Sequence, residues 1–275
     1  MNHPFEIAGG SITGHAHVAA GRNNQDAFSW ATNDAGLVAV VCDGCGSGAH
    51  SEVGAQVGAR LITQAAARRL HDAKDISTVL EDVRQEVLAG LRTLGAAMSA
   101  EAPSSRESQF ARNFARTVSD YFLFTAVGVI VTADHATVFA LGDGLVVVNG
   151  DRQRLGPYPN NQPPYLGYAL LPEGAGPRDL ETFTFQVLRS LPLGELRSLL
   201  LGTDGTADLD DLSGHLVHGR EDRVGPLSGF WTDDRFFRNA DMVRRRFTVL
   251  SRGPHRGLLA DDTTLVVLRR KGTEP

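Results

Sequence analysis

The sequence predicts an α+β fold built on antiparallel β-sheets, and the order of its elements is the main reason. Two helical segments come early, a block of apolar runs follows, and further helical periodicity comes late. Strands and helices therefore do not alternate as the βαβ units of a parallel sheet require. The 275 residues could form one large domain or two small ones, but no repeat or low-complexity segment separates two halves. We expect a single domain over residues 1–275, since 42% apolar residues supply an ample core.

Eight apolar runs, most of them rich in Val, Leu or Phe, are predicted to be strands. The run at residues 29–32 is the weakest of them. The others are residues 37–42, 122–132, 137–141, 145–148, 183–188, 198–201 and 264–268.

The clearest helical periodicity covers residues 51–70. Its predicted buried face is formed by Val53, Val57, Leu61, Ile62 and Ala65. Gly54 and Gly58 lie in the same segment and indicate that this helix packs closely against its neighbours.

Three further segments show a helical pattern, and two others are predicted to be loops. Residues 77–94 carry a regular apolar stripe with Ser77 as a suitable N-cap, and weaker patterns cover residues 108–119 and 233–250. Residues 103–106 and the Pro- and Asn-rich residues 156–168 are typical of surface loops. The second loop is long enough to have a functional role.

Composition and charge exclude several classes of protein. The formal net charge of −5 gives no basic surface for nucleic acid. The sequence also contains no run of about 18 apolar residues, the length that a helix needs to cross a membrane. The amino-terminal residues lack the charged-then-apolar order of a secretory signal, so we expect a cytoplasmic protein. Cys42 and Cys45 form a C-x-x-C pair without a second ligand pair at zinc spacing. We interpret Cys42 as a small buried hydrophobe.

Carboxylates stand at the ends of several predicted strands. These residues are Asp26, Asp43, Asp143, Asp204, Asp261 and Asp262. A single Asp-Gly pair is more often only a turn, but several carboxylates meeting at strand ends without cations would repel one another strongly. An oxygen-lined cluster of this kind is typical of Mg²⁺ or Mn²⁺ sites. Gly44, which follows Asp43, would let its own carbonyl approach such a metal.

Five short motifs then occur in a fixed order: Q-D, V-C-D-G-C-G-S-G, G-D-G, G-T-D-G and D-D-T-T-L-V-V. In this order they resemble the metal-dependent type 2C (PPM) protein serine/threonine phosphatases, and a bacterial branch with G-x-x-H near its start in particular. The resemblance runs from about residue 11 to 269. It implies a sandwich of two antiparallel β-sheets flanked by α-helices, with a two-metal centre at one edge.

The resemblance also implies a role for each matching residue. Asp43 would bridge two metals, and the Gly44 carbonyl would bind one of them. Asp204 and Asp261 would hold the other metal, and Asp26 would be a ligand or an acceptor just outside the ligand shell. We expect Asp43 and Asp204 to be essential for catalysis.

Asp143 matches the family position of a third, weaker metal, and three positions depart from the usual pattern. Gln25 replaces a glutamate and removes one negative charge from the site. The arginine that binds substrate phosphate usually stands where this chain has Gly21, so Arg22 is the shifted candidate for that catalytic role. Cys45 replaces a histidine proposed as the leaving-group acid in many eukaryotic members. The nearby histidines are interpreted as structural, although His50 could reach the cleft rim; they are His15, His17 and His50.

Three hypotheses about function follow from these residues. The first is a phosphatase that hydrolyses phosphoserine and phosphothreonine with a water activated by two Mn²⁺ or Mg²⁺ ions. Its partners would be a phosphorylated protein substrate and a serine/threonine kinase or its target. The alternative is a catalytically weak or inactive relative that serves as a partner-binding regulatory module. Dinucleotide binding is disfavoured because Ala49 stands at the third glycine position of G-x-G-x-x-G.

Overall fold

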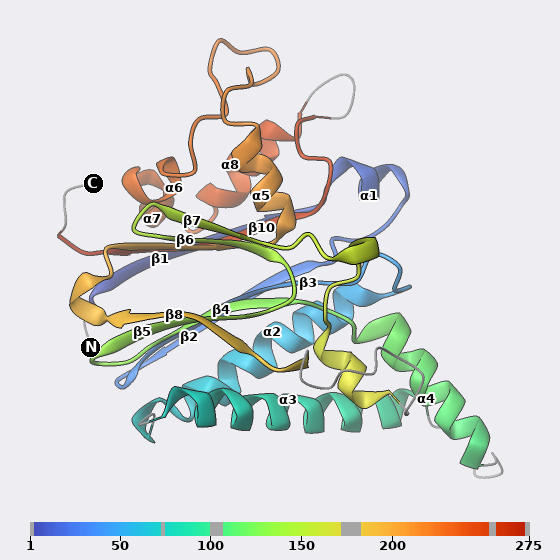
Figure 1. Cartoon of the computed structure of the whole chain (residues 1–275). Coiled ribbons are helices and arrows are strands. Elements are labelled where there is room, and N and C mark those ends of the chain that lie inside the picture. The colour runs from blue at the N-terminus through green and yellow to red at the C-terminus, as the bar shows by residue number, and fades with distance from the viewer. Residues whose placement is uncertain (1–2, 73–74, 100–106, 172–182, 253–256, 273–275) are drawn as a thin grey trace.

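The computed structural model describes residues 3–72, 75–99, 107–171, 183–252 and 257–272, and it consists of two five-stranded antiparallel sheets packed face to face (Figure 1). The strand order is β1-β10-β9-β6-β7 in one sheet and β2-β3-β4-β5-β8 in the other. Helices cover the outer face of each sheet. The predicted α+β sandwich is confirmed. Within the described ranges, no helix combines the length and apolar character needed to cross a bilayer.

The strands have the following bounds. They are β1 (Phe5–Ile12), β2 (Asp26–Asn33), β3 (Gly36–Asp43), β4 (Ala126–Val131), β5 (His135–Leu141), β6 (Gly144–Val148), β7 (Asp151–Leu155), β8 (Gln186–Pro192), β9 (Ser198–Gly202) and β10 (Thr263–Arg270).

The α-helices are α1 (His15–Ala19), α2 (Ser51–Ala67), α3 (Ile76–Ser99), α4 (Glu107–Tyr121), α5 (Asp204–Asp211), α6 (Gly229–Thr232), α7 (Arg235–Arg238) and α8 (Met242–Leu250). Short 3₁₀ turns occur at Leu70–Asp72, Pro159–Asn161, Leu166–Leu170 and Leu193–Glu195. Helices α2 and α3 lie along the sheet that contains β3, and α5 to α8 lie over the other sheet (Figure 1).

Strand β3 shows how the layers are held together. Leu37, Ala39 and Val41 point between the two sheets, whereas Val38 and Cys42 point toward the helices. This alternation follows from the two-residue period of a strand, and every one of these side chains is buried because both faces of β3 are covered. Cys42 is therefore a buried hydrophobe, as predicted.

Helix α2 packs closely, as its glycines indicate, but its buried face differs from the predicted one. A Cβ on Gly54 would lie 1.9 Å from the Tyr121 carbonyl oxygen, and one on Gly58 would lie 2.2 Å from the Phe124 ring. Val53 was predicted to be buried, yet it is 37% exposed. The buried face consists mainly of small residues, because only those allow this approach.

Several predicted boundaries are wrong. The run at residues 122–132 forms strand β4 only from Ala126 onward, and β8 begins later than the predicted 183–188. The helix predicted at 233–250 is divided into α7 and α8. Asp75, not Ser77, supplies the carboxylate that accepts the first backbone N–H groups of α3, at 3.1 and 3.3 Å.

Five elements were missed, and their sequences explain why. Strand β1 contains two adjacent glycines and a glutamate, and strand β7 reads DRQRL and is almost wholly exposed at a sheet edge. Neither is an apolar run. Helices α1, α5 and α6 have eight residues or fewer, too short for a periodic signal. The loop predicted at 103–106 lies outside the described residues.

Strand register brings the carboxylates to one edge of the sandwich. Strand β2 begins where β3 ends, so Asp26 pairs directly with Asp43. In the other sheet, Gly202 at the end of β9 pairs with residues near the beginnings of β6 and β10. The residues that follow β9 and precede β10 therefore meet those at the end of β3.

Candidate metal centre

A cavity of about 330 Å³ at this edge collects most of the predicted metal ligands. Its walls include Asp43, Gly44, Asp143, Asp204 and Asp261. They come from both sheets, since β3 and β9 belong to different layers and Asp143 lies in the turn from β5 to β6. The cavity brings these five residues together, and their role as metal ligands stays a prediction.

The electrostatics of the cavity favour a cation. Burial, together with the charges of Asp26 and Asp204, raises the pKa of Asp43 well above its ordinary value. Burial and the charges of Asp261 and Asp143 likewise raise the pKa of Asp204 to about 7. Burial also raises the pKa of Asp143. The carboxylates therefore resist ionisation together, and bound positive charge would relieve their repulsion.

The backbone at Gly44 forms part of the wall. Its N–H donates to the Gln25 carbonyl at 3.0 Å, which ties the loop after β3 to the residue before β2. A Cβ at this position would lie 2.8 Å from the Ser51 carbonyl oxygen and 2.9 Å from that of Gln25. Only glycine fits at this position, so the main chain borders the cavity directly, without a side chain in between.

Gln25 provides a direct test of whether a cation fits. The residue is only 3% exposed and lines the cavity, and Oε1 has no hydrogen-bond partner among the described atoms. A buried amide oxygen without a partner costs about 1–3 kcal/mol. A divalent cation, or water bound to it, is the kind of partner that this oxygen lacks, so the residues present fit the metals that the sequence predicts.

Asp26 lies behind the cavity and is not part of its wall. The side chain is buried, and the Thr203 hydroxyl donates to its Oδ2 at 2.7 Å. Burial raises the pKa of Asp26 well above its usual value, whereas the hydrogen bond from Thr203 acts in the opposite direction. The sequence predicts that Asp26 is either a metal ligand or an acceptor just outside the ligand shell, and this position fits the second role.

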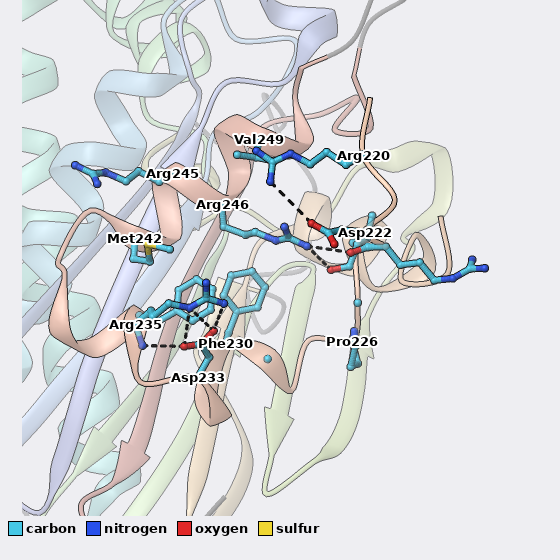
Figure 2. A pocket seen from close by; sticks show the side chains of 15 residues that line it. Arg220, Asp222, Pro226, Phe230, Asp233, Arg235, Met242, Arg245, Arg246 and Val249 are labelled. Carbon is cyan, nitrogen blue, oxygen red and sulfur yellow. Dashed lines mark hydrogen bonds and ion pairs between the residues drawn. The ribbon is translucent and has the colours of Figure 1, made fainter. Parts of the chain in front are cut away.

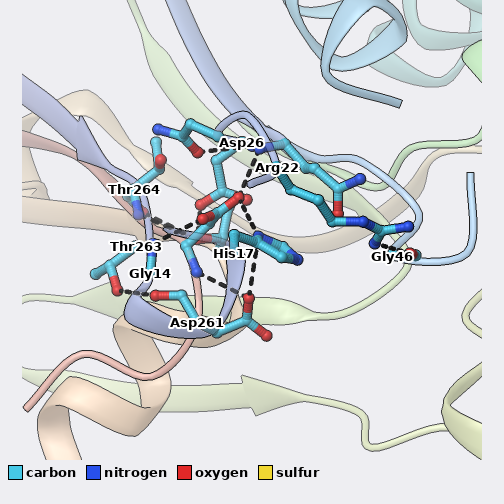
Figure 3. Close-up of polar contacts among 12 residues, drawn as sticks. Gly14, His17, Arg22, Asp26, Gly46, Asp261, Thr263 and Thr264 are labelled. Atoms are coloured by element: carbon cyan, nitrogen blue, oxygen red, sulfur yellow. Dashed lines mark hydrogen bonds and ion pairs between the residues drawn. The ribbon is translucent and has the colours of Figure 1, made fainter. Parts of the chain in front are cut away.

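Asp262 has a role that the sequence did not reveal. Its carboxylate is buried and accepts hydrogen bonds from the backbone N–H groups of Gly14, at 2.7 Å, and Gln25, at 2.5 Å. His17 Nδ1 lies 2.9 Å from Asp262 Oδ2, at ion-pair distance but without hydrogen-bond geometry (Figure 3). Asp261, by contrast, is 51% exposed. Asp261 lines the cavity, whereas the adjacent Asp262 anchors the loop.

Arg22 lies at the rim. Its backbone N–H donates to the His17 carbonyl, and its exposed guanidinium donates to the carbonyl of Gly46 (Figure 3). Gly46 lines the cavity but Arg22 does not. The predicted phosphate-binding arginine is thus close to the site without pointing into it in this conformation.

The loop at residues 156–168, which the sequence predicted to be long enough for a functional role, forms part of the cavity wall. Asn160, Asn161 and Gln162 line the cavity, and Asn160 and Asn161 have φ values of 56° and 52°, which asparagine tolerates better than most residues. Tyr165 also lines it. Burial and the neighbouring Cys45 raise the pKa of the Tyr165 hydroxyl far above its usual value.

The remaining histidines lie outside the cavity wall. His50 is half exposed and its ring lies 4.9 Å from that of Tyr121, and His15 is partly buried. Among the three histidines near the motifs, only His17 lines the cavity.

Comparison with known proteins identifies the class. A model of the protein phosphatase 2C family matches residues 13–233, so the chain belongs to this family. No curated protein matches the chain.

Solved structures agree in fold. A bacterial serine phosphatase carrying an arginine-to-alanine substitution is 14% identical, with a TM-score of 0.51, over 98% of this chain and 100% of the other. PppA, described as a key regulatory component of T6SS in Pseudomonas aeruginosa, is 17% identical, with a TM-score of 0.50, over 98% of each chain. At such identities the likeness establishes the fold alone.

Proposed function

We propose that this protein is a divalent-metal-dependent phosphatase that hydrolyses phosphoserine and phosphothreonine in proteins. One observation carries the proposal: four carboxylates and an unpartnered amide oxygen meet in one cavity of a protein phosphatase 2C fold. A module that only binds partners would not need carboxylates with mutually raised pKa values. The expected partners are a phosphorylated protein and the kinase that modifies it.

Each part of the site has a distinct task in this proposal. Asp43, Asp204 and Asp261, with the Gly44 carbonyl, would hold two Mn²⁺ or Mg²⁺ ions, and Asp143 a third, weaker one. When bound, the cations would supply Lewis-acid activation of water and neutralise charge on the phosphoryl group. The chain itself places Tyr165 in the cavity wall and fixes the end of β3 through the Thr125 amide, which donates to the Asp43 carbonyl at 2.8 Å.

The position of Arg22 favours the alternative of a weakly active, partner-binding protein, because the guanidinium is bound to the Gly46 carbonyl and does not itself line the cavity. One assay separates the two functions. Hydrolysis of p-nitrophenyl phosphate and of a phosphothreonine peptide is measured with Mn²⁺, with Mg²⁺ and with EDTA. Metal-dependent turnover that EDTA abolishes supports the enzyme, and no turnover with either metal contradicts it.

Gln25→Glu is expected to lower the Mn²⁺ concentration needed for half-maximal activity by about three- to tenfold, with little change in kcat at saturating metal. A carboxylate at this buried position adds negative charge beside the cations, which strengthens their binding without altering the attack on phosphorus. The measurement is a metal titration of activity in both proteins.

The control for this titration is Asn24→Asp, which adds a charge one residue away on a partly buried side chain that hydrogen-bonds Ser11 at 2.6 Å and does not line the cavity. If Gln25→Glu and wild type give superimposable titrations, Gln25 does not act on the metals and the assignment of this motif is wrong.

Removal of residues 160–162 is expected to raise KM for a phosphothreonine peptide about threefold or more, with hydrolysis of p-nitrophenyl phosphate unchanged. These residues line the cavity but supply no carboxylate, so they can contact a long substrate without holding the metals. Steady-state kinetics on both substrates checks this expectation. Equal losses on the two substrates would show that the loop supports the metal centre itself.

A further inference from the structure

A second cavity, of about 570 Å³, lies over the sheet that contains β1 and shares no lining residue with the carboxylate-lined cavity (Figure 2). One wall is the segment 220–226, and the other is formed by helices α6, α7 and α8. Its charge is opposite to that of the whole chain, which carries a formal net charge of −5. Only two aspartates line it, against five arginines: Arg220, Arg223, Arg235, Arg245 and Arg246.

Arg246 is the central cation of this arginine cavity. Its Nη2 donates to the carbonyl of Val224 at 2.7 Å and to that of Arg223 at 3.2 Å, so both of its close partners there are neutral. Within the described part of the chain, no carboxylate lies within ion-pair distance of Arg246 or of Arg223. Burial, and then the nearby Arg220 and Arg235, lower the pKa of Arg246, while Asp222 acts in the opposite direction. Arg220, Arg235 and Arg245 are paired with Asp222, Asp233 and Asp241, so the positive charge that no carboxylate of the described residues pairs is that of Arg223 and Arg246.

The segment that forms the wall is ordered by its own hydrogen bonds. Val217 N–H donates to the Asp222 carbonyl at 2.8 Å, and Val224 N–H donates to the His215 carbonyl at 2.9 Å. Arg246 then ties this segment to α8. The wall is therefore in place before any ligand arrives, which lowers the entropic cost of binding.

The floor is apolar, and the rim is open. Phe230 and Phe236 are buried below the arginines with ring centroids 4.8 Å apart. The side chains of Arg220, Arg235 and Arg245 are 52%, 73% and 63% exposed, so they stand around an open groove that would not enclose a small molecule. Such a groove suits an extended chain that places an apolar side chain on the floor and negative charges toward the rim.

We propose that the arginine cavity is a docking site for an acidic peptide segment, whose negative charge is carried by Asp and Glu side chains or by phosphorylated Ser and Thr. The ligand identity rests on charge complementarity and on the apolar floor. That the segment belongs to the phosphoprotein being hydrolysed rests on the proposed function. Docking there would hold a substrate at a distance from the metal centre and raise the effective concentration of its phosphorylated residue.

Binding is tested with the full chain carrying Asp43→Asn in EDTA, because hydrolysis cannot then consume the probe and no metal can attract it. The probes are three fluorescent ten-residue peptides with one central phenylalanine: a glutamate-rich peptide, its glutamine counterpart, and a glutamine-rich peptide with two phosphoserines. We expect the glutamate and phosphoserine peptides to bind, with an affinity that falls as salt screens the charges, and the glutamine peptide not to bind.

Substitutions then locate the site. Arg246→Gln is expected to weaken peptide binding about tenfold, because a partly buried charge pair with the peptide is lost. Arg220→Gln is expected to weaken it about threefold, because the side chain of Arg220 is exposed. Arg220→Gln removes no hydrogen bond that holds the wall, so its result stands even if Arg246→Gln loosens the segment. Arg246→Lys keeps the charge and is expected to lose less than Arg246→Gln. The matched control is Arg238→Gln, on α7 beside the cavity but outside its lining and paired with Asp234 at 2.7 Å.

The proposal is overturned if no charged peptide binds, if the glutamine peptide binds equally well, or if Arg220→Gln and Arg246→Gln bind like Arg238→Gln. Displacement of the peptides by phosphatidylserine vesicles, with the vesicles binding far more tightly than either peptide, would overturn the peptide assignment in favour of a lipid surface. Absence of phosphatase activity would leave these results unchanged. Conversely, an active enzyme whose charged peptides do not bind would refute the docking site alone.

Discussion

Asp43→Asn and Asp204→Asn are each expected to reduce hydrolysis of p-nitrophenyl phosphate by more than about a hundredfold while the protein remains folded. Loss of a group outside the ligand shell of a metal typically costs 10- to 100-fold, and a direct ligand should cost more. An amide has the shape of the carboxylate but no charge, so the variant keeps its packing and loses the attraction for the cation. Activity is measured at saturating Mn²⁺, and folding by circular dichroism.

Asp211→Asn is the matched control for this pair. Asp211 lies on the same helix as Asp204, its side chain is 71% exposed, and it is paired with Arg154 at 3.0 Å outside the cavity wall. Its removal is expected to leave turnover within about twofold of wild type, as for most exposed ion pairs. Near-wild-type activity in either cavity variant would show that the metal assignment is wrong.

The free energy of unfolding of the metal-free protein is expected to fall as pH rises. Asp204→Asn is expected to make this fall smaller. The pKa of Asp204 is raised from 3.8 to about 7 in the folded state. A group with a raised folded-state pKa contributes stability that is fully present below its unfolded pKa and is lost as pH rises through the folded value. The free energy of unfolding of wild type in EDTA should therefore be lower at pH 8 than at pH 5.

The size of this effect follows from the shift. A difference of about three pKa units corresponds to about 4 kcal/mol of folding free energy. Water in the cavity and the interaction among the carboxylates reduce the contribution of Asp204 alone to about 1–3 kcal/mol. At pH 8 in EDTA, Asp204→Asn should thus unfold at a temperature several degrees above that of wild type. Thermal unfolding at both pH values measures it.

Mn²⁺ supplies the internal control, because it should stabilise wild type at pH 8 far more than the variant. At pH 8 the inactive protein would then be the more stable one when metal is absent. Parallel pH profiles for the two proteins in EDTA would show that the carboxylates do not repel one another as their raised pKa values require.

The fold and the residues that line the cavity could be predicted from the sequence for different reasons. Strands such as β3 and β9 are buried on both faces, so each is a continuous apolar run that can be recognised in a single sequence. The exposed edge strand β7 has no such signal, because its pairing with β6 is set by the tertiary structure. Likewise, the aspartates after apolar strands could be found by position, but the neighbours that orient them could not.

Asp262 illustrates the part that the sequence could not reveal. Two adjacent aspartates look alike in a sequence, and the direction of each side chain depends on the backbone before β10, which bends at Asp261. The same holds for Arg22, which the family resemblance made a candidate phosphate ligand although it is shifted by one residue, whereas the loop after α1 directs it to a carbonyl. Spacing along the chain identifies candidate site residues, but the direction of the backbone determines which of their side chains reach the site.

The carboxylates of the cavity come from both layers of the sandwich, and this has a mechanical consequence. Asp43 ends a strand of one sheet, Asp204 and Asp261 adjoin strands of the other, and the chain crosses between the layers at Asp143. Without cations, this edge is where like charges push the two sheets apart, although apolar packing holds them together elsewhere. If the proposed cations bind, the same edge would become a cross-link between the two layers, and the packing of one sheet on the other would depend on metal.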